Sequence, residues 1–514
     1  MLDLTPILRP AFSRTFRRAN AAVTRTDTER TQQRVLDALT AAGARTCYGR
    51  DHGIRRGMGY EEYAATVPVV EYPDIRPLVE LMVQGRRDIL WPGVCRRFAQ
   101  SSGTSDGKSK YIPVTPDSLS FNHYRGARAV VANYLQINPR SRLFSGKAFI
   151  LGGSFANEVA DLPAGVKVGD LSAHLIDRMP AAASLLRVPG KKLALTADWN
   201  EKLPALVEAS MRADITNISG VPSWFLTVLQ RVVERAGAQT VHDVWPNLEV
   251  FFHGGIAFGP YRELYRSLTD PARMHYLETY NASEGFFAVQ DNPASHAGMR
   301  LLLDAGVFYE FVDTSDPAAR PLPAWQLEQG RVYAMLITAP NGLWRYAIGD
   351  TVRVDTAEPL RITIAGRTKH FINAFGEEVM VHNTDAALTA ACRITGARAR
   401  DYTAAPVYAH DRSRGRHQWL IEWQTPPADA DVFARTLDAE LQKVNSDYQA
   451  KRAGGLFLDC LTVTDARPGL FDRWLASTGK LGGQRKVPRL ANDRRLMDLL
   501  LKMNESDTQL LTLI

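Results

Sequence analysis

Short apolar runs recur along much of the chain, and each ends beside small or polar residues. They are residues 148–151, 248–252, 274–277 and 332–337. Runs of this length and composition are typical of strands buried on both faces, and the intervals between them are long enough for helices. The pattern predicts an α/β architecture with mixed sheets, in which ligands lie where strands end and loops begin.

Polar and apolar residues follow a helical spacing near the N-terminus. Residues 28–41 read as an amphipathic helix, and residues 60–72 as a short helix that leads into a proline-containing turn. The first eighteen residues contain four arginines, which imitates a transit peptide. Because the pattern continues into a globular sequence, we expect an ordinary helix there instead.

The pattern changes near Gly366. The elements predicted beyond it are a strand at residues 417–423, a break at Pro426 and Pro427, a helix capped by Asp429 or Asp431, and a strand at residues 456–463. We therefore expect a large N-terminal domain with mixed β-sheets over residues 1–366 and a smaller, mobile α+β C-terminal domain over residues 367–514. A chain of 514 residues does exceed what one core normally supports.

Composition narrows the class of protein. With 45% apolar and 23% charged residues the chain is neither disordered nor fibrous. Lys and Arg (62) exceed Asp and Glu (55) by 7, and the arginines are scattered, so we expect no nucleic-acid partner.

The four cysteines lie far apart without paired histidines, which predicts neither a zinc site nor disulfides and favours the cytoplasm. No apolar stretch is long enough to span a bilayer, so we expect no membrane partner, and we expect a monomer or weak homo-oligomer.

Residues 101–110 combine hydroxyl groups, glycines and two ammonium groups, which is the chemistry of a loop that binds phosphate. A P-loop needs four residues between its first glycine and the Gly-Lys pair, whereas three separate Gly103 from Gly107. Pro113 and Pro116 also rule out an immediate helix. The segment predicts a nucleotide loop of another type; an irregular P-loop and a surface loop without ligand are the alternatives.

Three further segments carry candidate chemistry. Glu284, in a turn after an apolar run, could hold magnesium, although such a residue can simply cap a turn. Gly254 and Gly255 end another run and permit a flat ring to lie against bare backbone, whereas His253 is better explained as structural than as a base. Asp350 is predicted to follow a tight turn, where its oxygens could accept the hydroxyls of a ribose or serve turn chemistry alone.

Residues 152–156 resemble the nucleophile elbow of a hydrolase, but Ala156 replaces the final glycine of that motif. We expect this segment to line a pocket. The segments 121–125 and 221–225 are expected to supply further pocket walls, and their aromatic residues hint at an apolar or aromatic ligand.

Taken in order and with their spacing, these motifs resemble those of the acyl acid amido synthetases first described as plant auxin-responsive proteins, the Gretchen Hagen three family. Residues 101–113 are similar to its first nucleotide motif, residues 280–285 to its second and residues 345–350 to its third. The resemblance extends from Thr46 to Arg489. Trp344 replaces a tyrosine often found there.

The resemblance implies membership of the adenylate-forming superfamily, together with ATP and Mg²⁺. The implied reaction has two steps: a carboxylic acid attacks the α-phosphorus of ATP, and an amine, typically of an amino acid, then attacks the acyl carbon of the adenylate. Catalysis of the first step is mostly placement and charge neutralisation.

The resemblance also implies roles for individual residues. Glu284 would bind magnesium, Asp350 would hold the ribose, Tyr280 would stack near the base, and Arg345 would neutralise phosphate or structure its turn. The residues implied to bind nucleotide are Ser101, Ser102, Thr104, Ser105, Gly254, Gly255, Tyr280, Ser283, Glu284, Arg345, Asp350 and Lys486, and those implied to act in catalysis are Ser102, Lys110 and Lys486.

The glycine-rich, basic run at residues 479–489 is similar to a mobile segment of the family. Lys486 is the favoured lysine that enters the site from the C-terminal domain, and Lys480 is the alternative. Residues 366–369 resemble the junction between the two domains, where a few residues absorb a rotation, and Lys369 stands where many relatives have Asp.

Two other functions share the same nucleotide motifs. One is a thioester ligase that uses coenzyme A, and the other is a nucleotide-binding module without turnover. For residues 479–489, a solvated basic tail without a catalytic lysine is the alternative explanation.

Overall fold

The computed structural model describes most of the chain. The described residues are 2–101, 110–155, 162–255, 258–292, 298–316, 318–367, 371–372, 379–407, 415–445, 448–449, 452, 458–478, 486–491 and 493–505. None of the helices within these ranges has the length and apolar character needed to cross a membrane.

Twelve strands of the described residues form one mixed sheet in the order β12-β11-β13-β14-β15-β10-β9-β8-β7-β6-β3-β5. Their bounds are β3 Lys147–Ile150, β5 Arg187–Val188, β6 Ile215–Gly220, β7 Val250–Gly254, β8 His275–Asn281, β9 Phe286–Val289, β10 Met299–Leu301, β11 Phe308–Asp313, β12 Leu322–Pro323, β13 Val332–Ala339, β14 Leu343–Ala357 and β15 Leu360–Arg367. The mixed α/β architecture predicted from the apolar runs is confirmed.

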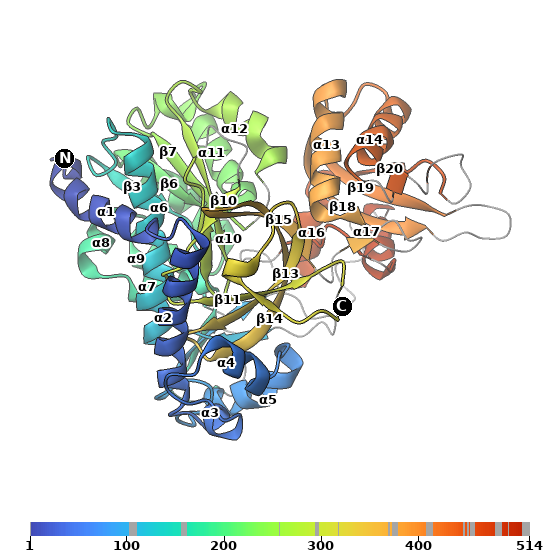
Figure 1. Cartoon of the computed structure of the whole chain (residues 1–514). Helices are drawn as coiled ribbons and strands as arrows, with labels where there is room; N and C mark the ends of the chain where they lie inside the picture. The colour runs from blue at the N-terminus through green and yellow to red at the C-terminus, as the bar shows by residue number, and fades with distance from the viewer. Residues whose placement is uncertain are drawn as a thin grey trace.

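One half of the sheet is parallel and covered on both faces. Strands β5, β3, β6, β7 and β8 run parallel, as expected for strands separated by helices. The helices of this half are α6 Tyr124–Ile137, α7 Leu171–Arg178, α8 Ala181–Leu185, α9 Lys191–Ala194, α10 Trp199–Met211, α11 Pro222–Ala236 and α12 Arg262–Leu268. Phe225 of α11 and Tyr265 of α12 pack with Phe251 of β7 in one cluster, while Val130 of α6 packs with Val250 in another. The alternation along β7 therefore buries both faces (Figure 1).

The other half of the sheet is antiparallel, and the helices α2 Arg25–Gly43, α3 Cys47–Asp51, α4 Tyr60–Thr66 and α5 Tyr72–Val83 share its core. The first helix, α1 Thr5–Ala19, packs against α6 instead. Trp344 of β14 packs against Trp91, and Leu36 and Leu39 of α2 lie in the same core. The two edge strands of the sheet, β5 and β12, have two residues each.

Three strands form a separate small sheet that carries the predicted phosphate loop. They are β1 Arg97–Ser101, β2 Lys110–Pro113 and β4 Lys167–Gly169, in the order β2-β1-β4. Ser101 and Lys110 are register partners at its end, so the ends of the predicted loop lie side by side. Ser102, Thr104 and Ser105 lie outside the described residues.

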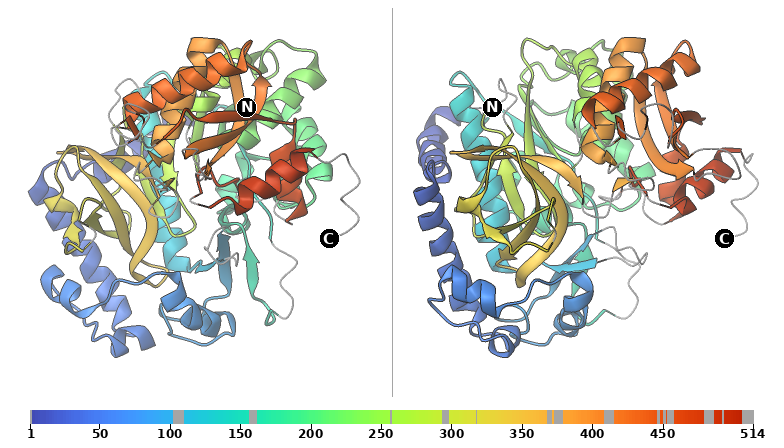
Figure 2. Two further views of the ribbon diagram at one scale, coloured as in Figure 1. Left: turned by 90° about the vertical axis from the view of Figure 1, so that its right-hand side faces the viewer. Right: turned by 45° about the vertical axis from the view of Figure 1, so that its right-hand side comes forward.

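The C-terminal lobe has its own sheet and core. Its elements are α13 Val381–Thr395, β18 Arg398–Val407, β19 Arg416–Thr425, α14 Ala430–Val444, β20 Thr462–Ala466, α16 Leu470–Ser477 and α17 Arg495–Glu505, with a short pair β16 Phe371–Ile372 and β17 Val379–Met380 before them. The sheet order is β18-β19-β20. In both views of Figure 2 this lobe (orange to red) lies at the opposite end of the molecule from α3–α5 (blue).

Most elements lie where the sequence pattern predicts them. The helix predicted at 28–41 is α2, and the Asp429 side chain accepts a hydrogen bond from the Val432 amide at 2.9 Å, as expected for the cap of α14. The basic N-terminus forms the helix α1. The last strand is displaced, because β20 covers Thr462–Ala466 instead of residues 456–463.

Candidate functional site

A cavity of about 2360 Å³ lies between the two lobes. Both lobes supply its walls, and seven of the residues predicted from the sequence line it: Gly254, Gly255, Tyr280, Ser283, Glu284, Asp350 and Lys486. Segments up to 232 residues apart in the chain, from Gly254 to Lys486, therefore meet around one space. The three predicted pocket walls also contribute, through His123 and Tyr124, Gly152 and Gly153, and Val221 and Trp224.

Glu284 lies in a turn that two buried asparagines hold in place. The Ala282 amide donates to the Gly285 carbonyl at 2.8 Å, which closes the turn between β8 and β9. Asn122 accepts from the Phe286 amide at 2.7 Å and donates to the Phe286 carbonyl at 2.9 Å. Asn341 donates to the Glu284 carbonyl at 3.1 Å. The backbone of Ser283 and Glu284 is thus fixed before any ligand binds.

Asp350 lies inside strand β14 and not after a tight turn, which corrects the sequence prediction. Gly349 has a φ of 84°, and the strand bends there without ending. The Tyr280 hydroxyl donates to the Asp350 carboxylate at 2.6 Å, and the Tyr280 ring packs edge-on against Phe287. Tyr280 therefore orients this carboxylate toward the cavity that both residues line.

The Gly254-Gly255 pair requires glycine at both positions, for different reasons. A Cβ on Gly254 would lie 2.4 Å from the Thr279 carbonyl oxygen of the neighbouring strand. Gly255 has a φ of 84°, and a Cβ there would lie 3.4 Å from the Lys486 ammonium nitrogen. Lys486 of the C-terminal lobe therefore reaches the glycine turn of the N-terminal lobe.

His253 lines the cavity, and its burial and packing support the structural role predicted for it. It is buried and stacks on Phe258 with ring centroids 4.2 Å apart. Burial lowers the pKa of His253 to about 3, with a smaller contribution from Arg262, so the ring is neutral near pH 7.

Arg345 structures the strand, and its contacts do not support the phosphate role considered for it. Its Nε and Nη2 donate to the Glu310 carboxylate at 2.8 to 3.1 Å. Its Nη1 donates to the Ala64 and Val67 carbonyls at 2.7 Å each. Arg345 is buried, its backbone φ is 44°, and it is not among the residues that line the cavity. Arg345 therefore stabilises the buried core of the N-terminal lobe, although its sequence motif resembles a nucleotide motif.

Lys110 lies at the base of the predicted phosphate loop. Its ammonium nitrogen is 3.4 Å from the Tyr346 hydroxyl and lies over the Tyr72 and Tyr346 rings. The partner strand ends at Ser101, of which only the backbone is described. A phosphate-binding role for these two residues stays a prediction.

The donor set fits a magnesium nucleotide better than a resident metal. No group of three or more His, Cys, Asp or Glu side chains gathers to hold an ion in the described ranges. Mg²⁺ bound with a nucleotide needs only one or two protein carboxylates, since phosphate oxygens and water fill the remaining positions. Glu284 is a carboxylate of that kind on the cavity wall.

Sequence reasoning missed the residues that position the site from behind. Asn122 and Asn341 are buried, and their side chains form hydrogen bonds with backbone atoms. Such contacts leave no recognisable sequence motif. Arg489 was noted within a basic run, yet its side chain joins the two lobes, with Nη2 3.4 Å from the Tyr261 hydroxyl and Nη1 bonded to Asp401. The Pro488-Arg489 pair in that run was the one sequence signal for this contact.

Three family models cover most of the chain. They are the GH3 family N-terminal domain over residues 21–274, the GH3 family central domain over residues 300–367 and the GH3 family C-terminal domain over residues 382–495.

Relatives and solved structures agree with these matches. The chain is 25% identical to the indole-3-acetic acid-amido synthetase GH3.8 of Oryza sativa subsp. indica, over 92% of this chain and 90% of that protein. Its fold is similar to that of a GH3.15 acyl acid amido synthetase in complex with 2,4-DB, with a TM-score of 0.79, 17% identity and coverage of 98% of both chains. It is also similar to a 2-hydroxyisobutyryl-CoA ligase in the postadenylation state, with a TM-score of 0.63, 15% identity and coverage of 93% and 92%. The chain belongs to the GH3 family.

Proposed function

We propose that this protein is an ATP-dependent acyl acid amido synthetase. It adenylates a carboxylic acid and transfers the acyl group to an amine, with an amino acid as the expected acceptor, releasing AMP and pyrophosphate. Membership of the GH3 family supports an amide-forming ligase over a thioester ligase or a nucleotide-binding module without turnover. We also propose Mg²⁺ as the accompanying ion.

In the first step, residues of this chain would bring the ATP phosphates and the carboxylate of the acid substrate together. Asp350, oriented by Tyr280, would hold the ribose hydroxyls, and the Gly254-Gly255 turn would accept the flat base. Glu284 would hold Mg²⁺, which supplies charge neutralisation when it is bound. Lys486 would place a positive charge where negative charge develops during attack of the acid carboxylate on phosphorus.

In the second step the amine attacks the acyl carbon and AMP leaves. A free carboxylate is a poor acyl donor because oxide would have to leave, whereas AMP leaves as a stabilised anion. The acid would extend along the walls formed by His123, Tyr124, Ile150 and Trp224, away from the glycine turn. Burial lowers the pKa of His123 to about 4, so this wall is uncharged near neutral pH.

The observation that carries the proposal is the convergence of both lobes on one cavity. Gly255, Glu284, Asp350 and Lys486 line the same space, and Lys486 lies against the position a Cβ of Gly255 would take. We further propose that the enzyme acts in the cytoplasm as a monomer or weak homo-oligomer with a mobile C-terminal domain from residue 367. The four free cysteines support a reducing compartment.

Product analysis tests the function. The protein is supplied with ATP, Mg²⁺ and a panel of carboxylic acids, with either an amino-acid mixture or coenzyme A, and products are identified by mass spectrometry. Amide, AMP and pyrophosphate are expected. Thioester as the sole product would replace the proposal with the ligase alternative, and ATP binding without acid-dependent pyrophosphate exchange would leave a binding module.

A further inference from the structure

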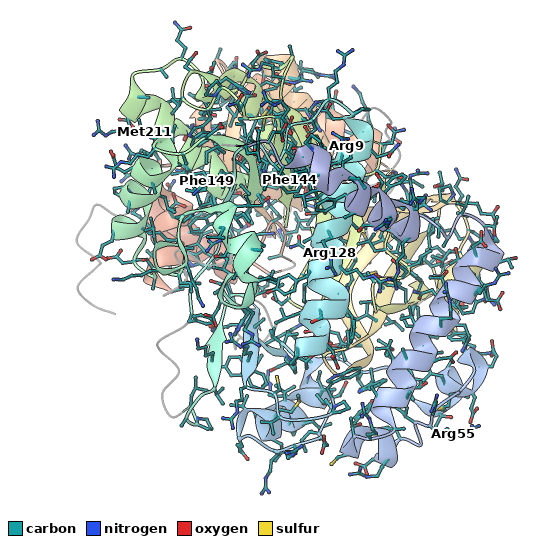
Figure 3. All side chains as sticks on the ribbon, turned by 90° about the vertical axis from the view of Figure 1, so that its left-hand side faces the viewer. Arg9, Arg55, Arg128, Phe144, Phe149 and Met211 are labelled. Carbon is teal, nitrogen blue, oxygen red and sulfur yellow. The ribbon has the colours of Figure 1, made fainter. Side chains whose placement is uncertain are left out.

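Arg187 lies on the edge strand β5, on the face of the sheet that α6 covers. Arg187 is the register partner of Ala148, which in turn pairs with Asn217, and Asn217 pairs with Val250. Register partners share a face, and Val250 packs against Val130 of α6. Figure 3 views the molecule from this side, with Arg128 labelled on α6 and Phe144 nearby.

The Arg187 guanidinium is buried without a partner. The residue is 4% exposed, and Nε, Nη1 and Nη2 have no hydrogen-bond partner within the described part of the chain. Burial lowers the pKa of Arg187, and no carboxylate contributes to that shift.

The other buried arginines are paired. Three arginines of the described ranges are buried. Arg345 is satisfied by Glu310, and Arg300 donates to the Asn20 and Ala22 carbonyls at 3.0 and 2.6 Å. A buried guanidinium is unfavourable unless a partner satisfies its donors. Arg187 therefore differs from Arg300 and Arg345, whose donors are satisfied by protein groups.

Arg187 lines the same cavity as the reaction site. The apolar residues that line this cavity include Phe12, Val131, Phe144, Ile150 and Leu186. Strand β6 ends at Gly220, three residues beyond Asn217, so the row of Arg187 lies about 10 Å along the sheet from the strand ends. The buried guanidinium of Arg187 therefore lines the same cavity as the nucleotide residues, in a row set back along the sheet from the strand ends.

We propose that Arg187 binds a second carboxylate, carried by the acid substrate at the end remote from the reacting group. The preferred substrates are then dicarboxylic acids with an apolar middle. A carboxylate fits because it accepts two parallel hydrogen bonds from the planar guanidinium fork and neutralises its charge. This inference rests on the proposed amido synthetase function.

Pyrophosphate exchange without amine tests the substrate class. A homologous series of straight-chain and aromatic dicarboxylic acids is compared with monocarboxylic acids of the same lengths. The parent enzyme is expected to use a dicarboxylic acid of matching length with a higher kcat/KM than its monocarboxylic counterpart. Equal or better use of every monocarboxylic acid would overturn the inference.

The variants Arg187→Met and Arg187→Lys test whether Arg187 causes the preference for dicarboxylic acids. Arg187→Met removes the charge and keeps an unbranched apolar side chain, and it should lower kcat/KM for the dicarboxylic acid about thirtyfold or more while leaving the monocarboxylic acid unchanged or improved. Arg187→Lys keeps the charge and should retain part of the preference. An unchanged preference in Arg187→Met would overturn the inference.

Thermal unfolding gives a readout independent of turnover. In the presence of Mg²⁺ and an α,β-methylene ATP analogue, the dicarboxylic acid should raise the Tm of the parent but not of Arg187→Met. Without ligand, Arg187→Met should be at least as stable as the parent, because removing a buried unpaired charge relieves its desolvation.

The outcomes separate this inference from the function on which it rests. Exchange with none of a broad panel of acids would reject the amido synthetase proposal itself. Exchange with equal use of both acid classes would reject only the role of Arg187. An effect of Arg187→Met that appears only when amino acid is added would assign the guanidinium to the carboxylate of the amine substrate and overturn the inference.

Discussion

Arg345 shows how far a residue's motif and its environment can differ. Its place in a nucleotide motif suggests phosphate chemistry, yet its side chain bonds Glu310 and two carbonyls of the N-terminal segment. Removing one partner of a buried ion pair leaves the other charge uncompensated, whereas removing both is far less costly.

Arg345→Met should therefore lower the free energy of unfolding by about 3–5 kcal/mol, measured by urea denaturation. The double variant Arg345→Met, Glu310→Leu should recover part of that loss. At a temperature where the single variant is folded, its pyrophosphate exchange should stay within about tenfold of the parent. Loss of exchange with unchanged stability would return Arg345 to the phosphate role.

Glu284 and Asp350 are expected to act on the nucleotide directly. Glu284→Gln and Asp350→Asn should each lower pyrophosphate exchange by about a hundredfold to a thousandfold, because each removes a preorganised contact while keeping the shape of the side chain. Tyr280→Phe removes only the hydroxyl that orients Asp350 and should cost less than Asp350→Asn. Near-parental exchange in both carboxylate variants would refute the assignment, provided their Tm values match the parent.

At the scale of elements, hydrophobic period predicts the strands well and their ends less well. The runs at 248–252 and 332–337 correspond to β7 Val250–Gly254 and β13 Val332–Ala339, because most positions on both faces of these strands are buried. Asp350 was placed after a turn because a Gly-Asp pair resembles one. The strand continues because Asp350 and Thr351 still pair with Arg367 and Gly366 of β15, which no local pattern reveals.

Histidines buried in these elements predict acid sensitivity. Burial lowers the pKa of His123 and His174 to about 4 and of His253 to about 3, against an ordinary value of 6.5. Between those values the unfolded chain binds protons that the folded chain does not, so stability is full above about pH 6.5 and falls as the pH drops.

Each such histidine should increase the loss of unfolding free energy by up to about 1.4 kcal/mol for each pH unit between its two pKa values. We expect the free energy of unfolding, measured in urea between pH 7 and 4, to fall with a smaller slope in His253→Leu and His253→Gln than in the parent. Parallel slopes in all three proteins would contradict a neutral, buried His253.

At the scale of the whole molecule, the site exists only where the lobes meet. Lys486 reaches Gly255, and Arg489 reaches Tyr261, from a lobe with its own sheet. The order and spacing of the motifs could be read from the sequence, and so could the motif residues and the three wall segments of the N-terminal lobe that line the cavity. Other lining residues, such as Phe12 and Arg187, could not. The contact between lobes could not, because it depends on the packing of β18 and α13 against residues 259–261.

The same contact separates the two candidate lysines. Lys486→Ala should lower pyrophosphate exchange about a hundredfold or more by removing the charge beside the glycine turn. Lys480→Ala, at a position outside the described residues, should leave exchange near the parental rate. The reverse result would move the adenylation role to Lys480 and would leave Lys486 a structural contact.

The twelve-stranded sheet is bounded on both sides by strands of two residues, and each carries or precedes a proline, Pro323 in β12 and Pro189 after β5. A proline offers no amide proton, and so short a strand presents few unpaired backbone groups to another chain. The described sheet can therefore be this broad without recruiting further strands from neighbouring molecules, which protects the enzyme against edge-to-edge aggregation when it is abundant.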